Sequence, residues 1–465
     1  MRQDEALAIM ETGRSALLTG AAGSGKTYVL ERFIRAARRS GRRVAVTATT
    51  GLAATHLGGV TIHAWSGIGV AETLPRGHAG TLSKQRQANI ESTDILVIDE
   101  VSMLHDFRLD MVDTICQEVR GDPSPFGGLQ VILCGDFFQL PPVNRREGRA
   151  GGFVTGSRAW RYAELAVLYL GEQHRQEDDP EFTDILNGLR HGGLRPGQLA
   201  MLNSRTGVRL ADELTATRLH TMNVDVDAEN ERELARLEGR SVEYEMTTSG
   251  AKQYVDQLTR SCLAPSVLRV KVGALVMFIK NAQDRRYSNG SLGQVTGFEE
   301  GGNLPLVRLA RGGKVITVRA ETWELVDGDK RRAQLTQLPL RLAWAITVHK
   351  SQGMTLDAAE IDLRRAFTPG MGYVALSRVI RLDRLALRGL GRMALEVSGE
   401  AISLEADLQA ASEAARLEYA SAIGVARSPD VEPGTALQAG AGRGIAGRES
   451  PGGSAQDEEG RAGPR

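Results

Sequence analysis

The sequence predicts an α/β protein with parallel sheets, and three observations support this fold class. The first 145 or so residues alternate helical stretches with short apolar runs of strand length, at 17–19, 44–48, 95–98 and 131–134. Such runs are typical of strands that are buried on both faces of a parallel sheet. A glycine-rich loop follows the first run, and a second series of the same kind follows the first series. The 465 residues are enough for about three domains.

The second series begins near residue 165 with an apolar run at 167–170. A helical stretch follows at 225–237, and further apolar runs lie at 338–347 and 385–387. This pattern predicts a second α/β domain, which the chain leaves and later re-enters.

Two segments interrupt the α/β pattern. Residues 58–92 are mixed and turn-rich, and indicate a small inserted subdomain. Short strands separated by glycine and asparagine turns recur at about ten-residue spacing, a pattern typical of a small antiparallel barrel. These strands lie at 274–279, 293–298, 304–309 and 314–319. From residue 424 onward there is no aromatic residue while glycine and proline recur, so we expect the tail to be disordered.

The composition excludes some classes of protein. Hydrophobic residues make up 42% of the chain and charged residues 25%, which is typical of a globular protein. Lys+Arg and Asp+Glu both total 57, and this balance neither supports nor excludes nucleic-acid binding. No apolar run approaches the ~20 residues of a membrane span, and no signal peptide is recognisable. Three scattered cysteines fit a reducing compartment, so we expect a cytoplasmic location.

Residues 20–27, Gly-Ala-Ala-Gly-Ser-Gly-Lys-Thr, fit the phosphate-binding loop between a strand and a helix. The glycines let the backbone N–H groups surround phosphates, Lys26 reaches the β and γ phosphates, and Thr27 offers a hydroxyl to Mg²⁺. A glycine-rich turn that binds nothing is the alternative. The nucleotide-binding residues expected here are Gly20, Gly23, Ser24, Gly25, Lys26 and Thr27.

The apolar run at 95–98 ends in two carboxylates. Asp99 is placed to hold Mg²⁺, directly or through water, and Glu100 to orient or deprotonate the attacking water. Such a pair is often structural by itself, but the preceding phosphate loop favours catalysis. Gln139 follows the run at 131–134 and could contact the γ-phosphate; taken alone, it is a polar loop residue.

Several motifs together resemble one family. The phosphate loop, Asp-Glu-Val-Ser-Met at 99–103, Pro-Phe-Gly-Gly-Leu-Gln at 125–130 and Gly-Asp-Phe-Phe-Gln-Leu-Pro-Pro-Val at 135–143 resemble the Pif DNA helicases, of the 5′-to-3′ branch of superfamily one. Residues 347–357 and 372–378 look like the fifth and sixth motifs of this family. The matches run in family order from Gln3 to about residue 390.

The resemblance implies two RecA-like parallel-sheet motor domains with a small wedge insertion and an inserted SH3-like β-barrel. The expected boundaries are 1–57 and 93–150 for the first motor domain, 58–92 for the wedge, 151–272 and 337–400 for the second motor domain, 273–336 for the SH3-like insertion, 401–423 for a C-terminal helix and 424–465 for the tail.

It also implies an ATP-dependent helicase that moves 5′-to-3′ on single-stranded DNA and unwinds duplex, with ATP and Mg²⁺ as cofactors. Gln3 looks like the glutamine that reads adenine. Arg175 and Arg378 look like the arginines that the second motor domain offers to the γ-phosphate, where a guanidinium stabilises the charge of phosphoryl transfer. Lys26, Asp99, Glu100 and Gln139 complete the expected catalytic set.

The expected partners are single-stranded DNA and single-strand/duplex junctions. Hydroxyl, imidazole and ammonium groups suit the backbone phosphates, so the contacts should not depend on base sequence. The residues expected to bind DNA are Thr49, His63, Thr347, His349, Lys350 and Ser351. A lone histidine such as His63 is also often purely structural.

The chain departs from the family pattern at two places. Met371-Gly372 stands where the family usually has Gln-Ala, and Met222 where it tends to have a small polar residue. Three alternatives are a RecD-like subunit of a recombination nuclease, a non-motor nucleotide-switch ATPase, and a catalytically silent DNA-binding protein. The second α/β domain argues against the switch, and the presence of Lys26 and Glu100 argues against the silent protein. For the helicase we expect a bacterial, nucleoid-associated location and roles in replication, recombination or repair, with a monomer as the simplest assembly.

Overall fold

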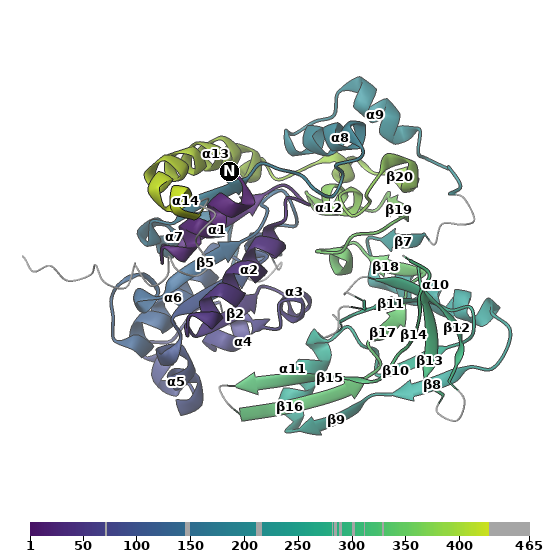
Figure 1. Ribbon diagram of the computed structural model, residues 1–465, viewed down its shortest axis with the longest axis horizontal. Coiled ribbons are helices and arrows are strands. Elements are labelled where there is room, and N and C mark those ends of the chain that lie inside the picture. The colour runs from purple at the N-terminus through teal and green to yellow at the C-terminus, as the bar shows by residue number, and fades with distance from the viewer. Residues whose placement is uncertain are drawn as a thin grey trace, which may run out of the picture.

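The computed structural model describes residues 1–69, 72–144, 149–210, 216–280, 282, 286–287, 291–299, 303–310, 312–327 and 330–426. The chain forms two parallel sheets, which lie side by side, and an antiparallel part below the second one (Figure 1). In the described part of the chain, no helix combines the length and the apolar character that crossing a bilayer requires.

The first domain is built on a six-stranded parallel sheet of order β3-β2-β4-β5-β1-β6. Its strands are β1 (Ala16–Gly20), β2 (Val44–Ala48), β3 (Val60–Thr61), β4 (Ile95–Asp99), β5 (Gln130–Cys134) and β6 (Ala166–Leu170). Its helices are α1 (Gln3–Glu11), α2 (Lys26–Arg39), α3 (Gly51–His56), α4 (Ile62–Ser66), α5 (Lys84–Ser92), α6 (Asp106–Arg120) and α7 (Arg158–Ala163).

Both faces of this sheet are covered, which explains the continuous apolar runs. Residues at alternate positions along the strands pack on α1 and α2 on one face, and on α6 on the other. For example, Leu18 belongs to the core beneath α2, while its neighbour Leu17 belongs to the core beneath α6. The loops at the carboxyl ends of the strands are therefore held on a rigid base.

Two of the expected boundaries of the first domain are wrong. The apolar run at 167–170 forms β6, which pairs with β1 and closes the first sheet instead of opening the second domain. Likewise β3, inside the expected wedge at 58–92, pairs with β2 as the opposite edge strand. A buried parallel strand has the same local pattern in either sheet, because its partner is distant in sequence.

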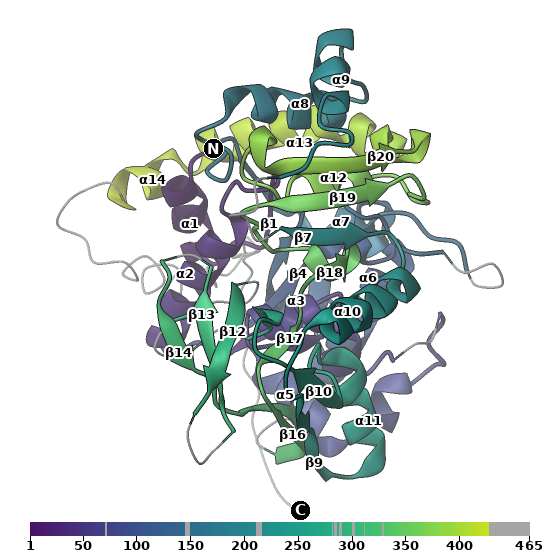
Figure 2. The same cartoon turned by 90° about the vertical axis from the view of Figure 1, so that its right-hand side faces the viewer.

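The second domain contains a four-stranded parallel sheet of order β18-β7-β19-β20. Figure 2 shows its strands one above another, with β20 at the top. Its strands are β7 (Thr217–His220), β18 (Ala345–Thr347), β19 (Ala359–Leu363) and β20 (Leu385–Leu390). Its helices are α8 (Pro180–Arg190), α9 (Pro196–Asn203), α10 (Asn223–Arg236) and α12 (Met371–Leu376), with a short 3-10 turn, η5 (His349–Ser351), after β18.

The inserted part is antiparallel, as expected, but begins well before residue 273. Residues 242–270 were expected in the second motor domain. Instead, their strands belong to a two-stranded sheet, β10-β8, and a three-stranded sheet, β15-β16-β9. A five-stranded sheet of order β14-β13-β12-β11-β17 accounts for the rest, and a closed SH3-like barrel is not established. The elements are β8 (Val242–Glu245), β9 (Thr247–Gly250), α11 (Lys252–Ser261), β10 (Val267–Val270), β11 (Leu275–Phe278), β12 (Leu292–Phe298), β13 (Pro305–Leu309), β14 (Val315–Thr317), β15 (Glu321–Asp327), β16 (Lys330–Gln337) and β17 (Leu340–Leu342).

The C-terminal segment returns to the first domain. It forms two helices, α13 (Gly399–Glu418) and α14 (Ala420–Ala426), where one helix at 401–423 was expected. α13 packs on β6, where the Ser412 hydroxyl accepts a hydrogen bond of 3.0 Å from the backbone N–H of Tyr169. α14 packs on α1, so both ends of the described chain meet (Figure 1). The expected disordered tail lies outside the described residues from 427 onward, while residues 424–426 are helical.

Candidate active site

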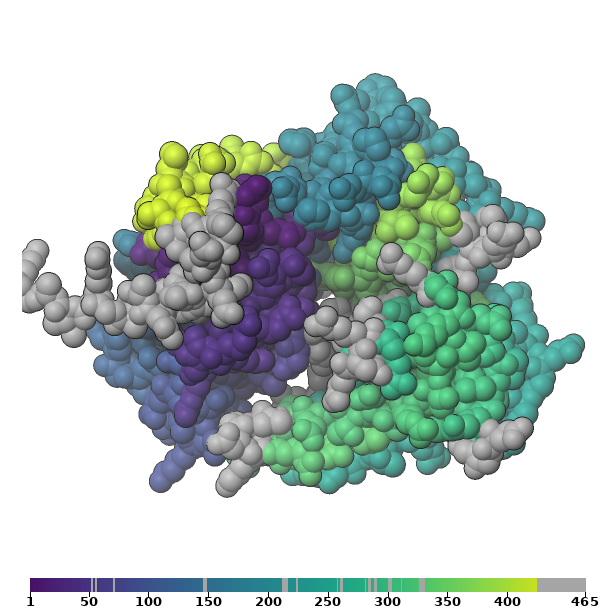
Figure 3. All heavy atoms as spheres, viewed as in Figure 1, coloured from purple at the N-terminus to yellow at the C-terminus, as the bar shows by residue number. Residues whose placement is uncertain are grey.

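A cavity of about 900 Å³ lies between the two domains. The molecule is visibly hollowed between the purple first domain and the green part of the chain in Figure 3. The first domain contributes the loops after β1, β2, β4 and β5, and the segment that follows β6 and the loops after β18 and α12 line the other side. Residues from both domains line it, among them Gly23, Gly25, Lys26, Thr27, Thr50, Asp99, Glu100, Gln139, Arg175, His349, Lys350, Gln352 and Arg378.

The phosphate-binding loop connects β1 to α2, as its motif predicts. Lys26 Nζ donates hydrogen bonds to the backbone oxygens of Gly20 and Ala21, at 2.8 and 3.0 Å, so the ammonium lies over its own loop. Burial lowers the pKa of Lys26, against the attraction of nearby acidic groups. Gly23 has a φ of +87°, and a Cβ there would lie 2.7 Å from the Cβ of Arg175. Glycine is therefore required where the loop touches the second domain.

The carboxylates after β4 occupy the same cavity as Thr27. Asp99 Oδ1 accepts a hydrogen bond of 2.8 Å from the Glu100 backbone N–H, which fixes the carboxylate at the strand end. Burial raises the pKa of Asp99, so its anionic form requires nearby positive charge. The hydroxyl of Thr27 and the carboxylate of Asp99 are hard oxygen ligands on one cavity wall, and this donor set fits Mg²⁺.

Glu100 combines an unusual backbone conformation with a shifted pKa. Its backbone has a φ of +53°, in the left-handed region that side chains rarely adopt, which turns the carboxylate into the cavity. Burial, and then the neighbouring Asp99, raise the pKa of Glu100 to about 7. A carboxylate with a pKa near neutrality suits a general base.

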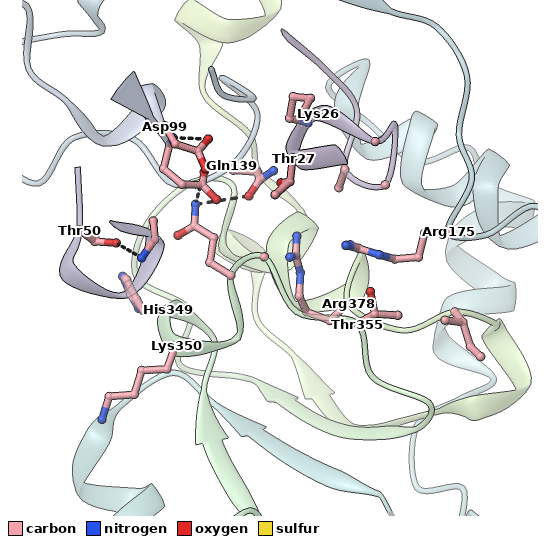
Figure 4. Close-up of a pocket in the computed structure, with 18 of the residues that line it drawn as sticks. Lys26, Thr27, Thr50, Asp99, Gln139, Arg175, His349, Lys350, Thr355 and Arg378 are labelled. Carbon is pink, nitrogen blue, oxygen red and sulfur yellow. Dashed lines mark hydrogen bonds between the residues drawn. The ribbon is translucent and has the colours of Figure 1, made fainter. Parts of the chain in front are cut away.

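Gln352 connects Glu100 to the second domain, and sequence analysis did not identify it. Its Nε2 donates a hydrogen bond of 2.9 Å to Glu100 Oε2 and a longer one of 3.4 Å to Gln139 Oε1. Figure 4 shows these bonds converging between the two glutamines and the carboxylate. Gln352 directly follows η5, so the segment that carries His349 and Lys350 also contacts the Glu100 carboxylate.

Arg175 and Arg378 face Asp99 and Gln139 from the opposite side of the cavity (Figure 4). Arg175 Nη1 donates to the Ser377 backbone oxygen at 2.9 Å, and Arg378 Nε donates to the Val374 backbone oxygen at 2.8 Å. Burial lowers the pKa of both, that of Arg175 to about 9 with help from the neighbouring Arg378. Within the described residues neither guanidinium forms an ion pair, and both line the cavity as largely buried cations.

Gln3 lies beside the phosphate-binding loop, outside the cavity lining. Its Nε2 donates a hydrogen bond of 3.1 Å to the Ser24 backbone oxygen, and its side chain packs against Gly25. Gly20 and Ser24 also lie outside the lining, because Gly20 packs on Leu170 and Ser24 is fully buried. These three residues support the loop in this structure.

The residues expected to bind DNA divide into two groups. His349 and Lys350 line the cavity, as does Thr50, the neighbour of the expected contact Thr49. Thr347 and Ser351 are 3% and 0% exposed. The Thr347 hydroxyl accepts from the Lys350 backbone N–H, and the Ser351 hydroxyl donates to the Val348 backbone oxygen. This corrects the expectation for Thr347 and Ser351: their hydroxyls stabilise η5 internally and are not available to DNA.

Thr49 and His63 are not on the cavity wall. The Thr49 hydroxyl donates a hydrogen bond of 2.9 Å to the Glu100 backbone oxygen. His63 lies in α4, and burial, with nearby Arg108 and His105, lowers its pKa to about 4. Its imidazole is therefore neutral near pH 7 and lacks the positive charge that would attract a phosphate.

A buried polar network beneath the cavity joins both domains to α13. Arg190 Nη1 lies 2.8 Å from Asp136 Oδ1, and Arg190 Nη2 lies 3.3 Å from Glu405 Oε1. The Tyr373 hydroxyl accepts a hydrogen bond of 2.9 Å from the Ala22 backbone N–H of the phosphate loop and donates to Asp136 at 3.3 Å. Burial alone would raise the pKa of Asp136, but Arg190 and Lys26 outweigh it and hold the pKa low.

The departure at Met371-Gly372 has a packing explanation. Met371 is fully buried, so this position faces the core and not the cavity. A Cβ at Gly372 would overlap the backbone oxygen of Ala394, which lies in a 3-10 turn (Arg392–Leu395). The pair therefore fits the close approach of this turn to α12.

Comparisons with known proteins agree with this geometry. Residues 4–196 match the model of the PIF1-like helicases, and residues 253–298 match the 2B domain of the DNA helicase Pif1. An ATP-dependent DNA helicase Pif1 from Psychrobacter sp. is 40% identical over 457 residues, which cover 85% of this chain and 69% of that helicase. The chain belongs to the Pif1 family of ATP-dependent DNA helicases.

Solved Pif1 structures share the fold. A Bacteroides sp. Pif1 in complex with ADP-AlF4 superposes with a TM-score of 0.76 at 30% identity, covering 88% of this chain and 97% of that one. The Bacteroides Pif1 in complex with ADP-AlF3 and ssDNA superposes with a TM-score of 0.61 at 30% identity, covering 87% and 94%. Human Pif1 is 36% identical, but this chain covers only 62% of its length, so the human helicase contains additional sequence.

Proposed function

We propose that this Pif1-family chain is a motor that uses ATP to move 5′-to-3′ along single-stranded DNA and to separate duplex ahead of it. One observation carries the proposal: the cavity places Lys26 and Glu100 of one domain opposite Arg175 and Arg378 of the other. A triphosphate bound there would interact with both domains, so its hydrolysis would change how strongly they are held together.

The side chains divide the work of phosphoryl transfer. Lys26 and the loop N–H groups bind the phosphates, while Arg175 and Arg378 stabilise the negative charge that develops on the transferred group. Glu100, with its raised pKa, accepts a proton from the attacking water. Thr27 and Asp99 would hold Mg²⁺, which supplies charge neutralisation at the phosphates when bound. Gln3, which lies beside the loop, would contact the base of the nucleotide.

Gln352 and Gln139 would couple hydrolysis to DNA. His349 and Lys350 lie on the same short segment as Gln352, and Gln352 holds Glu100. DNA bound at His349 and Lys350 would therefore move Gln352, and with it the hydrogen bond that Gln352 donates to the Glu100 carboxylate. The Bacteroides complex with ADP-AlF3 and ssDNA supports simultaneous occupation of the two sites in the family.

Phosphate contacts make the proposed DNA binding independent of base sequence and steeply dependent on salt. Direction is tested with one duplex that carries either a 5′ or a 3′ single-stranded overhang, at equal ATP and protein. We expect unwinding of the 5′-tailed duplex only. Unwinding of only the 3′-tailed duplex would refute the proposed direction while leaving the nucleotide site intact.

A further inference from the structure

One aromatic side chain near the cavity has no role in the function proposed above. Phe367 is 60% exposed, whereas the other nine phenylalanines of the sequence are buried or half-buried. A large apolar ring in water has a cost that packing normally removes. Single exposed rings are common, so the location of Phe367, not its exposure alone, is what bears on a role.

Phe367 lies at the same sheet edge as the expected DNA contacts. β18, β7 and β19 are neighbouring parallel strands, so the loops at their carboxyl ends meet. His349 follows β18, Met222 follows β7, and Phe367 follows β19. Met222, the methionine that departs from the family pattern, is itself 44% exposed. Three consecutive strand ends thus present apolar or aromatic surface.

The rings of Phe367 and His349 are stacked. Their centroids are 6.0 Å apart and their planes differ by 17°. Burial lowers the pKa of His349, so its imidazole is neutral near pH 7 and presents a flat π surface. His349 also lines the cavity, so Phe367 lies beside a residue of the cavity wall.

The surroundings favour nucleic acid over an apolar protein partner. Lys350 follows His349, and Arg365, whose side chain is 72% exposed, precedes Phe367 by two residues. Arg365 also forms a long ion pair of 3.9 Å with Asp225 of α10, the helix that begins directly after Met222. Aromatic rings flanked by cations are typical of sites where bases stack and backbone phosphates are neutralised.

We propose that Phe367 and His349 form a stacking platform for an unpaired base of single-stranded DNA, with Met222 extending its apolar floor. This inference rests on the proposed function, because it assumes that the strand passes His349 and Lys350. It adds a contact to bases, whereas the contacts expected from sequence all go to phosphates.

The test compares the affinity for a single-stranded oligonucleotide of the full chain with that of Phe367→Ala, Phe367→Leu and Phe367→Trp. We expect the alanine and leucine variants to bind roughly 5- to 100-fold more weakly, and the tryptophan variant to bind like the wild type, because stacking requires a ring. Tyr162→Ala, which removes a 72% exposed aromatic from α7 of the first domain, is the matched control and should change nothing.

Two further measurements separate stacking from other causes. The slope of log affinity against log salt should be the same in wild type and Phe367→Ala, because the number of phosphate contacts is unchanged. With an oligonucleotide whose central bases are abasic, the two proteins should bind equally. Wild-type affinity in Phe367→Ala or Phe367→Leu, or an altered salt slope, would overturn the platform. Failure of the wild type to bind any single-stranded DNA would instead overturn the proposed function itself.

Discussion

Gln352 Nε2 lies 2.9 Å from Glu100 Oε2, and this hydrogen bond joins the second domain directly to the carboxylate of the first domain that we propose as the general base. Gln352 belongs to the segment that also offers His349 and Lys350 to the cavity. Gln352 therefore links the proposed base to the proposed DNA-binding segment. Substituting Gln352 tests whether DNA binding affects the base through this contact.

Gln352→Ala should weaken the stimulation of ATP hydrolysis by single-stranded DNA. A hydrogen bond to a charged group contributes about 1.5–3 kcal/mol, so we expect the stimulated kcat to fall roughly 10- to 100-fold. The affinity for nucleotide should equal that of the wild type, because Gln352 contacts Glu100 and not the phosphate loop. Steady-state ATPase assays with and without DNA measure this. Gln294→Ala, an exposed glutamine of the insertion, serves as the control; equal stimulation in Gln352→Ala and wild type would refute the coupling.

Glu100→Gln should abolish hydrolysis while ATP still binds. Removing a general base costs roughly 10²- to 10⁴-fold in rate, but the phosphates are held by Lys26 and the loop. Lys26→Ala should differ by weakening nucleotide binding itself. A fluorescent ATP analogue distinguishes the two variants. Near wild-type hydrolysis by Glu100→Gln in the presence of DNA would show that the base is another residue.

Glu100 should also make stability depend on pH. Its folded-state pKa of about 7 exceeds the ordinary value of 4.5, so between these pH values the folded chain binds more protons than the unfolded chain. The stability that Glu100 contributes is complete below pH 4.5 and is lost as pH rises through 7. Glu100→Gln cannot ionise, so its Tm relative to wild type should increase from pH 5 to pH 8. The exposed Glu413→Gln should show no such trend.

Arg190→Leu should destabilise the fold strongly. It leaves Asp136 buried without its cation, and breaking one partner of a buried pair costs about 3–5 kcal/mol. Arg195→Leu, which breaks an exposed pair with Asp184, should cost less than about 1 kcal/mol. Thermal unfolding followed by circular dichroism compares the two. If both variants lowered Tm equally, the network would not be what holds the domains together.

It was predictable that the phosphate loop and the carboxylates would meet in one cavity, because their sequence signals are local. The phosphate loop and the carboxylates after β4 each occupy one short stretch, and parallel strands bring their carboxyl ends to one sheet edge. Arg190 and Gln352 were not predictable in this way. No motif around Arg190 marks it as part of a buried network, and its partners Asp136 and Glu405 are 54 and 215 residues away along the chain.

The fold was predictable in class but not in every boundary. β6 has the apolar pattern of any buried strand, and only its pairing with β1 assigns it to the first sheet. Thr347 and Ser351 show the same limit at the level of side chains. In sequence, a hydroxyl that hydrogen-bonds to DNA cannot be distinguished from one that hydrogen-bonds within its own turn. Only the structure shows that these two hydroxyls are buried and bonded within the turn.

The hydrogen bond between Tyr169 and Ser412 has a consequence for how the chain is made. The two residues are 243 positions apart, so β6 leaves the ribosome long before the helix that covers it. Until then, the edge of the first sheet is open, and an open edge strand can pair with a strand of another chain. α13 thus completes the first domain last, and nascent chains that stop short of it should be prone to aggregate.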